Sequence, residues 1–146
     1  MATAKKATSK AEGTFTDDEK EAMKARAREA KKGKKADGLA DLKAAIDELP
    51  AEDKKLAERL HRIVTEAAPD LQPKTWYGMP AWADSNGKAV CFFTPGAKFK
   101  ERYASFGFNA NAKLDDGNMW PTSFALLELG DAEEKKISAL VKKAIG

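Results

Sequence analysis

Aromatic residues are confined to one stretch of the chain, and this constrains the fold more than any other feature. Of the twelve Phe, Trp and Tyr residues, only Phe15 lies outside residues 76–124. Gly, Pro, Asn and Asp also concentrate there, a combination typical of short strands joined by turns. The flanking stretches instead carry apolar residues at helical spacing. The pattern predicts an α+β fold, with a small antiparallel sheet of about four strands packed against an N-terminal helix pair and a C-terminal helix.

Proline residues divide the predicted helix pair. Apolar stripes over 39–49 and 56–67 each recur every three or four residues, which indicates two amphipathic helices. Pro50 ends the first helix and opens the second, because proline is tolerated in the first helical turn but not in the interior. Pro69 closes the second. We expect the two helices to pack as an antiparallel pair.

Capping boxes mark two further helix starts. Asp131 with Glu134 predicts the start of a C-terminal helix that continues to about residue 145. Thr16 with Glu19 predicts another helix over 17–32.

The central stretch is divided into strands by its turn residues. Ser85-Asn86-Gly87 predicts a hairpin turn, and Asp115 to Asn118 predicts another turn. Pro80 lacks a backbone N–H, so we place its strand at an edge or bulge of the sheet. The expected strands span 76–82, 88–94, 103–108 and 124–129.

The basic character of the chain belongs to its N-terminal part. Residues 1–38 hold eleven Lys or Arg against seven Asp or Glu, whereas the remainder holds fifteen against sixteen. We predict a disordered basic tail over 1–15, a helical extension with a Lys-rich linker over 16–38, and one domain over 39–146. Residues 1–38 could contact phosphates, but no aromatic residue interleaves their lysines, so nucleic-acid binding is the least favoured hypothesis.

The remaining composition indicates a cytoplasmic protein. Cys91 is the sole cysteine, which excludes an intramolecular disulfide and suits a reducing compartment. The chain has neither an apolar run of about 18 residues nor a secretory signal, so we expect no membrane partner. The oligomeric state stays open.

No recognised catalytic motif is present, and the isolated reactive residues have simpler interpretations. Cys91 alternates with Val90 and Phe92, which puts it on one strand face with Phe93 and predicts a core residue. His61 flanks the apolar stripe of its helix and is interpreted as a surface histidine. We therefore assign no catalytic residue and favour a binding protein over an enzyme.

A cluster of large side chains is the first candidate site. A strand over 76–82 would put its two tryptophans on one face, and its Tyr and Met on the other. Either face could be core; at a sheet edge, one face could line a ligand pocket. The candidate pocket residues are Trp76, Tyr77, Met79, Trp82 and Trp120.

Four segments of the aromatic half and its approach carry a family signal: Pro73 to Ala81 (PKTWYGMPA), Val90 to Phe93 (VCFF), Phe106 to Phe108 (FGF) and Leu114 to Thr122 (LDDGNMWPT). In this order they resemble the YdhG-like proteins, a domain of unknown function. The resemblance spans about residues 39–145 and implies an α+β fold.

Some members of that family are described as frataxin-like intracellular iron chaperones. The resemblance therefore implies a carrier that holds iron weakly on surface carboxylates and passes it to iron–sulfur or haem assembly proteins. Asp115 and Asp116 are the candidate metal ligands that this implies; as an alternative, both are ordinary turn residues. The competing hypothesis is a small-molecule-binding module that uses the aromatic pocket.

Overall fold

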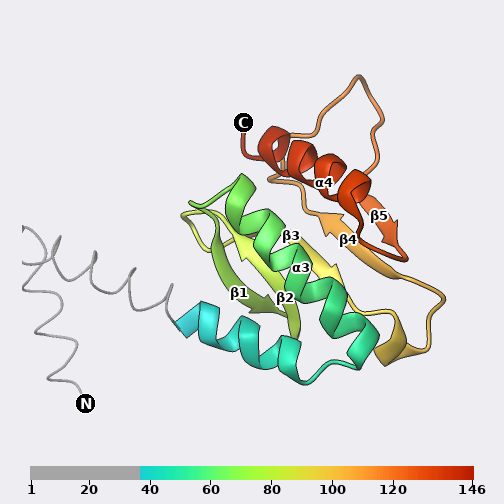
Figure 1. The fold of residues 1–146 in the computed structure, drawn as a ribbon. Coiled ribbons are helices and arrows are strands. Elements are labelled where there is room, and N and C mark those ends of the chain that lie inside the picture. Colours follow the sequence, from blue (N-terminus) through green and yellow to red (C-terminus); the bar gives the residue numbers. More distant parts are fainter. Residues whose placement is uncertain (1–36) are drawn as a thin grey trace, which may run out of the picture. The chain divides into compact units, whose positions relative to one another are not determined.

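The helical and aromatic stretches of the sequence form two layers, with helices on one face of an antiparallel sheet (Figure 1). This computed structural model describes residues 37–146, all within one compact unit. The α+β fold class is confirmed. The predictions for 1–15 and for most of 16–38, including the Thr16–Glu19 capping box, lie outside the described residues.

The helix pair forms where the positions of Pro50 and Pro69 predict it. One helix spans residues 37–47, and α3 spans Ala51–Ala67 with Pro50 at its N-terminal boundary. The apolar stripes of both helices, which include Leu42, Ile46, Leu60 and Val64, are buried in one core. None of the helices in the described part of the chain is long and apolar enough to cross a membrane.

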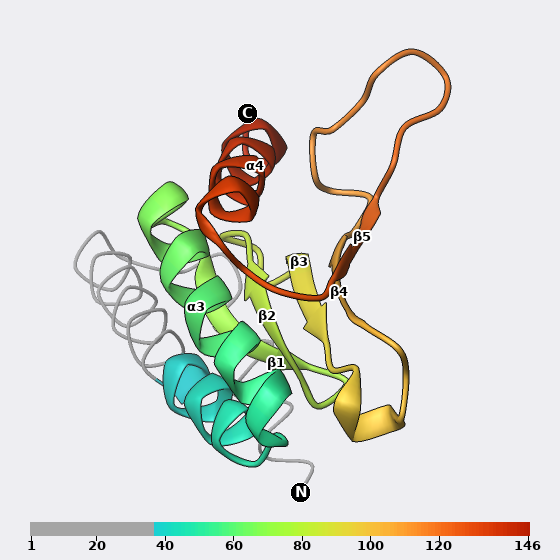
Figure 2. The ribbon, with the colours of Figure 1, turned by 45° about the vertical axis from the view of Figure 1, so that its right-hand side comes forward.

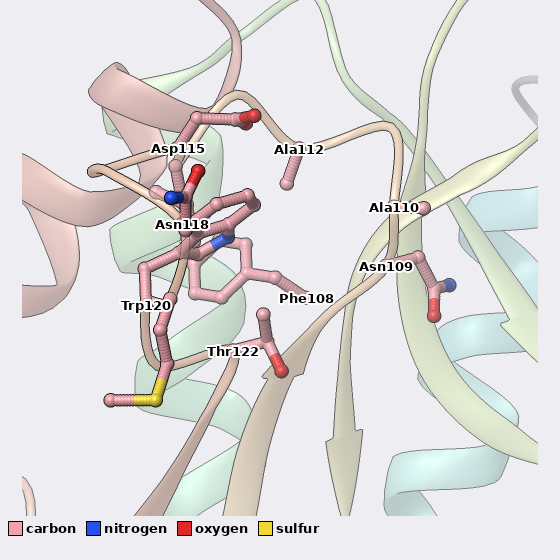
Figure 3. A pocket seen from close by; sticks show the side chains of 10 residues that line it. Phe108, Asn109, Ala110, Ala112, Asp115, Asn118, Trp120 and Thr122 are labelled. Carbon is pink, nitrogen blue, oxygen red and sulfur yellow. The ribbon is translucent and has the colours of Figure 1, made fainter.

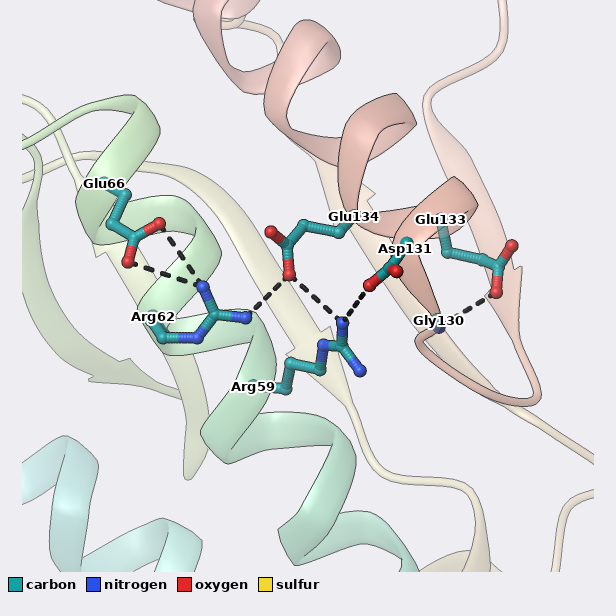
Figure 4. Close-up of polar contacts among 7 residues, drawn as sticks. All are labelled: Arg59, Arg62, Glu66, Gly130, Asp131, Glu133 and Glu134. Atoms are coloured by element: carbon teal, nitrogen blue, oxygen red, sulfur yellow. Dashed lines mark hydrogen bonds and ion pairs between the residues drawn. The ribbon is translucent and has the colours of Figure 1, made fainter.

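The C-terminal helix α4 (Asp131–Ala144) begins at the predicted residue but is capped differently. Gly130 is the N-cap, and its N–H donates to Glu133 Oε1 at 3.0 Å. Glu134 instead accepts hydrogen bonds from Arg59 at 3.3 Å and Arg62 at 2.6 Å, which join α4 to α3 (Figure 4). The predicted Asp131–Glu134 capping box is therefore wrong, because Asp131 already lies inside the helix.

The sheet is a five-stranded meander, with neighbours in the order β1-β2-β3-β4-β5 and all pairs antiparallel. It has one strand more than predicted because residues 76–82 form a hairpin instead of one strand. Tyr77 and Gly78 make its turn with positive φ angles of 51° and 76°. The predicted turn at Asn86-Gly87 does connect two strands. The strands are β1 (Gln72–Trp76), β2 (Met79–Ala83), β3 (Ala89–Thr94), β4 (Ala104–Phe108) and β5 (Ser123–Leu126).

Pro80 does not lie in an edge strand, because β2 pairs with both β1 and β3. The hairpin tolerates it for a local reason. Trp76 and Met79 close the two-residue turn, so the next pair, Thr75 and Pro80, is the kind that exchanges no backbone hydrogen bonds. The nitrogen of Pro80 then points toward β3, whose pairing with β2 begins only at Ala81.

The strand register separates two faces of the sheet. Trp82 pairs with Cys91, and Cys91 with Phe108, so these residues share the face covered by the helices (Figure 2). All three are buried in the core, which confirms the core assignment of Cys91. Phe92 and Gly107 pair on the opposite face. We call this the open face, because none of the described helices covers it (Figure 2).

A buried carboxylate fixes the connection after β3. Asp53, in the first turn of α3, is 2% exposed. Its two oxygens accept the backbone N–H groups of Gly96, Ala97 and Lys98 at 2.8–3.0 Å, around the short helix η1 (Ala97–Phe99). A carboxylate bonded to three N–H groups keeps partners for its charge after losing water.

Candidate functional site

The connection between β4 and β5 is the longest between strands and is fixed at its base by backbone hydrogen bonds. The N–H of Phe108 donates to the Thr122 carbonyl at 2.7 Å, which closes the loop over 109–122. Asn109 binds β3 twice, through its backbone N–H to Val90 at 2.9 Å and through Nδ2 to Ala89 at 3.0 Å. The two ends of the loop therefore leave the sheet in a defined direction.

Contacts with the rest of the domain also hold the first limb of the loop. Ala112 and Leu114 are buried in the core. Between them, the N–H of Lys113 donates to the Ala144 carbonyl at 2.8 Å, at the end of α4. The loop thus has no regular secondary structure but still has anchored backbone, which is the usual setting for binding residues.

The two limbs of this loop enclose a cleft of about 530 Å³, which we call the loop cleft. Figure 3 shows Asp115, Asn118 and Trp120 on one side, and Asn109 and Ala110 on the other. The floor includes Phe108, whose ring also packs against Phe106 at 4.9 Å between centroids. The complete lining is Phe108, Asn109, Ala110, Ala112, Leu114, Asp115, Asn118, Met119, Trp120 and Thr122.

The lining combines aromatic and apolar side chains with a single formal charge, the carboxylate of Asp115. No lysine or arginine is among the lining residues. Asp115 is exposed, and Trp120 is half-buried and packed against the core. A cleft of this kind can hold a flat ring against Trp120, while Asp115 accepts hydrogen bonds or pairs with a cation.

The five aromatic-pocket residues predicted from the sequence do not share one pocket. Trp76 and Met79 pair on the open face, and Tyr77 projects from the hairpin turn, 85% exposed. Trp82 lies on the opposite face and is 1% exposed, because the hairpin at Tyr77-Gly78 reverses the chain between the two tryptophans. Trp120 alone of the five lines the loop cleft.

Only one of the two candidate metal ligands lines the loop cleft. Asp115 lines the loop cleft, whereas Asp116 is exposed and is absent from its lining. Within residues 37–146, no group of three or more His, Cys, Asp or Glu side chains is arranged to hold a metal ion. The two carboxylates therefore have no third ligand of these types from the described chain.

His61 is more than a surface histidine. Its Nδ1 accepts the indole N–H of Trp82 at 3.1 Å, and the two rings stack at 6.1 Å between centroids. A neutral imidazole that accepts at Nδ1 carries its proton on Nε2. Burial, reinforced by the charge of Lys43, lowers the pKa of His61. In the structure, His61 accepts the hydrogen bond of the buried Trp82 indole N–H, which would otherwise lack an acceptor.

Cys91 is held in a form unsuited to nucleophilic chemistry. Its side chain is fully buried under the helices, and this burial raises the pKa of its thiol. A reactive cysteine needs an exposed, electropositive setting that favours the thiolate.

Two kinds of residue with a role in the structure were not predicted from the sequence. Phe108 and Asn118 line the loop cleft but were not singled out; both lie in or beside the segments that resemble the YdhG-like family. Asp53 was not singled out either, because a carboxylate in the first turn of a helix is common and nothing near it in the sequence indicates the three N–H groups that it binds.

The chain matches no family model, and no curated protein or solved structure matches it significantly. The YdhG-like resemblance and the iron-carrying role that it implies therefore stay predictions.

Proposed function

We propose that this protein binds a small ligand in the loop cleft, and that the ligand combines a flat ring with a positively charged group. The observation that carries the proposal is the presence of Trp120 and Asp115 in one cleft whose lining has no lysine or arginine. The volume of about 530 Å³ lies in the range usual for small-molecule sites.

The lining divides the work of recognition between two kinds of contact. Trp120 and Phe108 provide apolar area and ring faces, which attract both aromatic rings and cations. Asp115 adds the directional contact, because a carboxylate accepts charge-assisted hydrogen bonds from an ammonium group. A ligand with the same ring and a negative charge would meet repulsion from Asp115.

Binding is favoured over catalysis because the conventional reactive groups lie elsewhere. Neither Cys91 nor His61 lines the loop cleft. The thiol of Cys91 is buried, and Nδ1 of His61 already accepts the Trp82 N–H. A small-molecule-binding module is therefore our first proposal, ahead of the iron carrier that the family resemblance implies.

Calorimetric titration with tryptamine, whose indole ring carries an ammonium group, tests this proposal. We expect saturable binding that is tighter than that of neutral indole. Asp115→Asn removes the charge but keeps the shape, and should weaken tryptamine binding by about tenfold, the effect of ~1.4 kcal/mol. Asp116→Asn is the matched control, because Asp116 lies outside the lining, and should leave the affinity unchanged.

Three results would contradict the proposal: no saturable binding of tryptamine, equal affinities for tryptamine and indole, or equal effects of the two Asn substitutions. A parallel anaerobic titration with Fe(II) distinguishes this proposal from the iron-carrier hypothesis. If both carboxylates held iron, either substitution would weaken Fe(II) binding, whereas only Asp115→Asn should weaken tryptamine binding.

A further inference from the structure

The open face of the sheet carries two aromatic rings that pack against each other, those of Trp76 and Phe92. The register aligns Lys74, Ala81, Phe92 and Gly107 in one row across four strands. The Phe92 ring lies on Gly107, where an added Cβ atom would be only 2.6 Å from Phe92 Cζ. Trp76 packs against Phe92 at 4.8 Å between centroids. Ala81 is fully buried although no described helix covers this face.

Beside Trp76 lies a second cleft, of about 380 Å³, which we call the open-face cleft. Its lining includes the half-buried Trp76 together with Lys74 and Lys88. No aspartate or glutamate is among the lining residues. The open-face cleft thus pairs an indole with two positive charges, whereas the loop cleft pairs an indole with a negative one.

The two lysines are brought together by the turn between β2 and β3. Lys74 Nζ donates to the Gly87 carbonyl at 3.1 Å, directly beside Lys88 in the chain. Neither lysine forms an ion pair with any residue within 37–146. An ammonium group has three donors, so the Lys74 ammonium keeps donors for a ligand after this one bond.

Asp84 is an acidic residue of the same turn, and its carboxylate is already engaged in hydrogen bonds. It accepts the backbone N–H groups of Asn86 and Lys88 at 2.9 and 3.1 Å, and Nδ2 of Asn111 at 3.1 Å. Partial desolvation acts to raise the pKa of Asp84, but these hydrogen bonds and the Lys88 charge outweigh it and lower the pKa. Asp84 thus orders the turn without appearing in the lining of the open-face cleft.

We propose that the open-face cleft is a second binding site, for a flat ring that carries an anionic group. The ring would pack on Trp76, and the anion would receive hydrogen bonds from Lys74 and Lys88. An aromatic carboxylic acid and a nucleoside monophosphate both present this chemistry. The site is independent of the proposed function, because it shares only Asn109 and Ala110 with the loop cleft.

The three tryptophans make the test direct, because each reports a different environment through its indole N–H signal in ¹⁵N-labelled protein. Trp76 lines the open-face cleft, Trp120 lines the loop cleft, and Trp82 is buried. Indole-3-acetate and adenosine monophosphate are the probes, titrated separately. We expect either probe to shift the Trp76 signal saturably and to leave the Trp82 signal in place.

Variants locate the charges that the site needs. The double variant Lys74→Gln/Lys88→Gln should weaken binding of the anionic probes about tenfold. An unchanged Trp82 signal in this variant would show that its core is intact. Lys135→Gln, on the exposed side of α4, is the control and should have no effect.

Tighter binding of the monophosphate would favour a nucleotide as the ligand, and tighter binding of indole-3-acetate would favour an aromatic carboxylic acid. The proposal is overturned if neither probe shifts the Trp76 signal saturably, or if the double variant binds both as well as the unmodified protein does. Either failure leaves the tryptamine titration of the loop cleft unaffected.

Discussion

The two faces of this sheet hold aromatic side chains by different means. On the covered face, Phe93 and Phe106 are fully buried beneath the helices. On the open face, Phe92 lies on Gly107, Trp76 packs against Phe92, and both rings remain partly exposed. The covered face therefore contributes mainly to stability, whereas the open face keeps ordered rings within reach of a ligand.

Truncation of one ring on each face gives the largest expected contrast. Phe106→Ala should lower the free energy of unfolding by about 3–5 kcal/mol, because it leaves a cavity against Trp82 and Phe108. Phe92→Ala should cost only about 1–2 kcal/mol, because less apolar area returns to water. Guanidinium chloride unfolding measures both, and equal losses would contradict the distinction between the two faces.

The next largest effect is expected where the helical layer holds the end of β3. Asp53→Asn leaves at least one of three backbone N–H groups without its acceptor and should lower the free energy of unfolding by about 2 kcal/mol. Glu52→Gln, at the exposed neighbouring position, is the control and should change stability by less than about 0.5 kcal/mol. If both substitutions had the same small effect, Asp53 would not anchor η1.

The smallest expected effect is a pH dependence of stability, and it arises from His61, which contacts Trp82 on the covered face. The pKa of His61 is lowered from 6.5 in the folded protein, so the unfolded chain binds the proton more readily. The stability that neutral His61 provides is therefore present above about pH 6.5 and is lost as the pH falls through the folded pKa. Protonation also puts an N–H where Trp82 donates.

Unfolding curves at pH 7.5 and 5.5 test this expectation. The unmodified protein should be less stable at the lower pH. His61→Gln keeps a hydrogen-bond acceptor but does not titrate, so its two curves should lie closer together. An equal decline in both proteins would assign the pH dependence to other groups.

Local signals explain which elements could be predicted from the sequence. Pro50 and Pro69 bound α3 correctly, and Asn86-Gly87 marked a true hairpin, because each effect depends on neighbouring residues only. The hairpin at Tyr77-Gly78 was missed, because a tyrosine with a φ of 51° is uncommon at a turn. Because of that one turn, Trp76 and Trp82 lie on opposite faces of the sheet and cannot line one pocket.

The loop cleft was accessible to sequence analysis only in part. Asp115 and Trp120 were both singled out, but for different sites. Their meeting depends on the path of the loop over 109–122, which long-range bonds such as Lys113 N–H to the Ala144 carbonyl fix. No local sequence pattern reveals a contact such as that between Lys113 and Ala144, which lie far apart in the chain.

The clefts beside Trp120 and Trp76 extend the comparison from rings to charges. One lining carries a single carboxylate, and the other carries two ammonium groups. An indole that carries a positive group should therefore bind in the loop cleft, and an indole that carries a negative group should bind in the open-face cleft.

A tryptamine titration of ¹⁵N-labelled protein, followed at the three tryptophan indole signals, tests ligand binding in the loop cleft most directly. We expect a saturable shift of the Trp120 signal that Asp115→Asn reduces and Asp116→Asn does not, with the Trp82 signal unchanged. Absence of a Trp120 shift, or a larger shift at Trp76 than at Trp120, would contradict it.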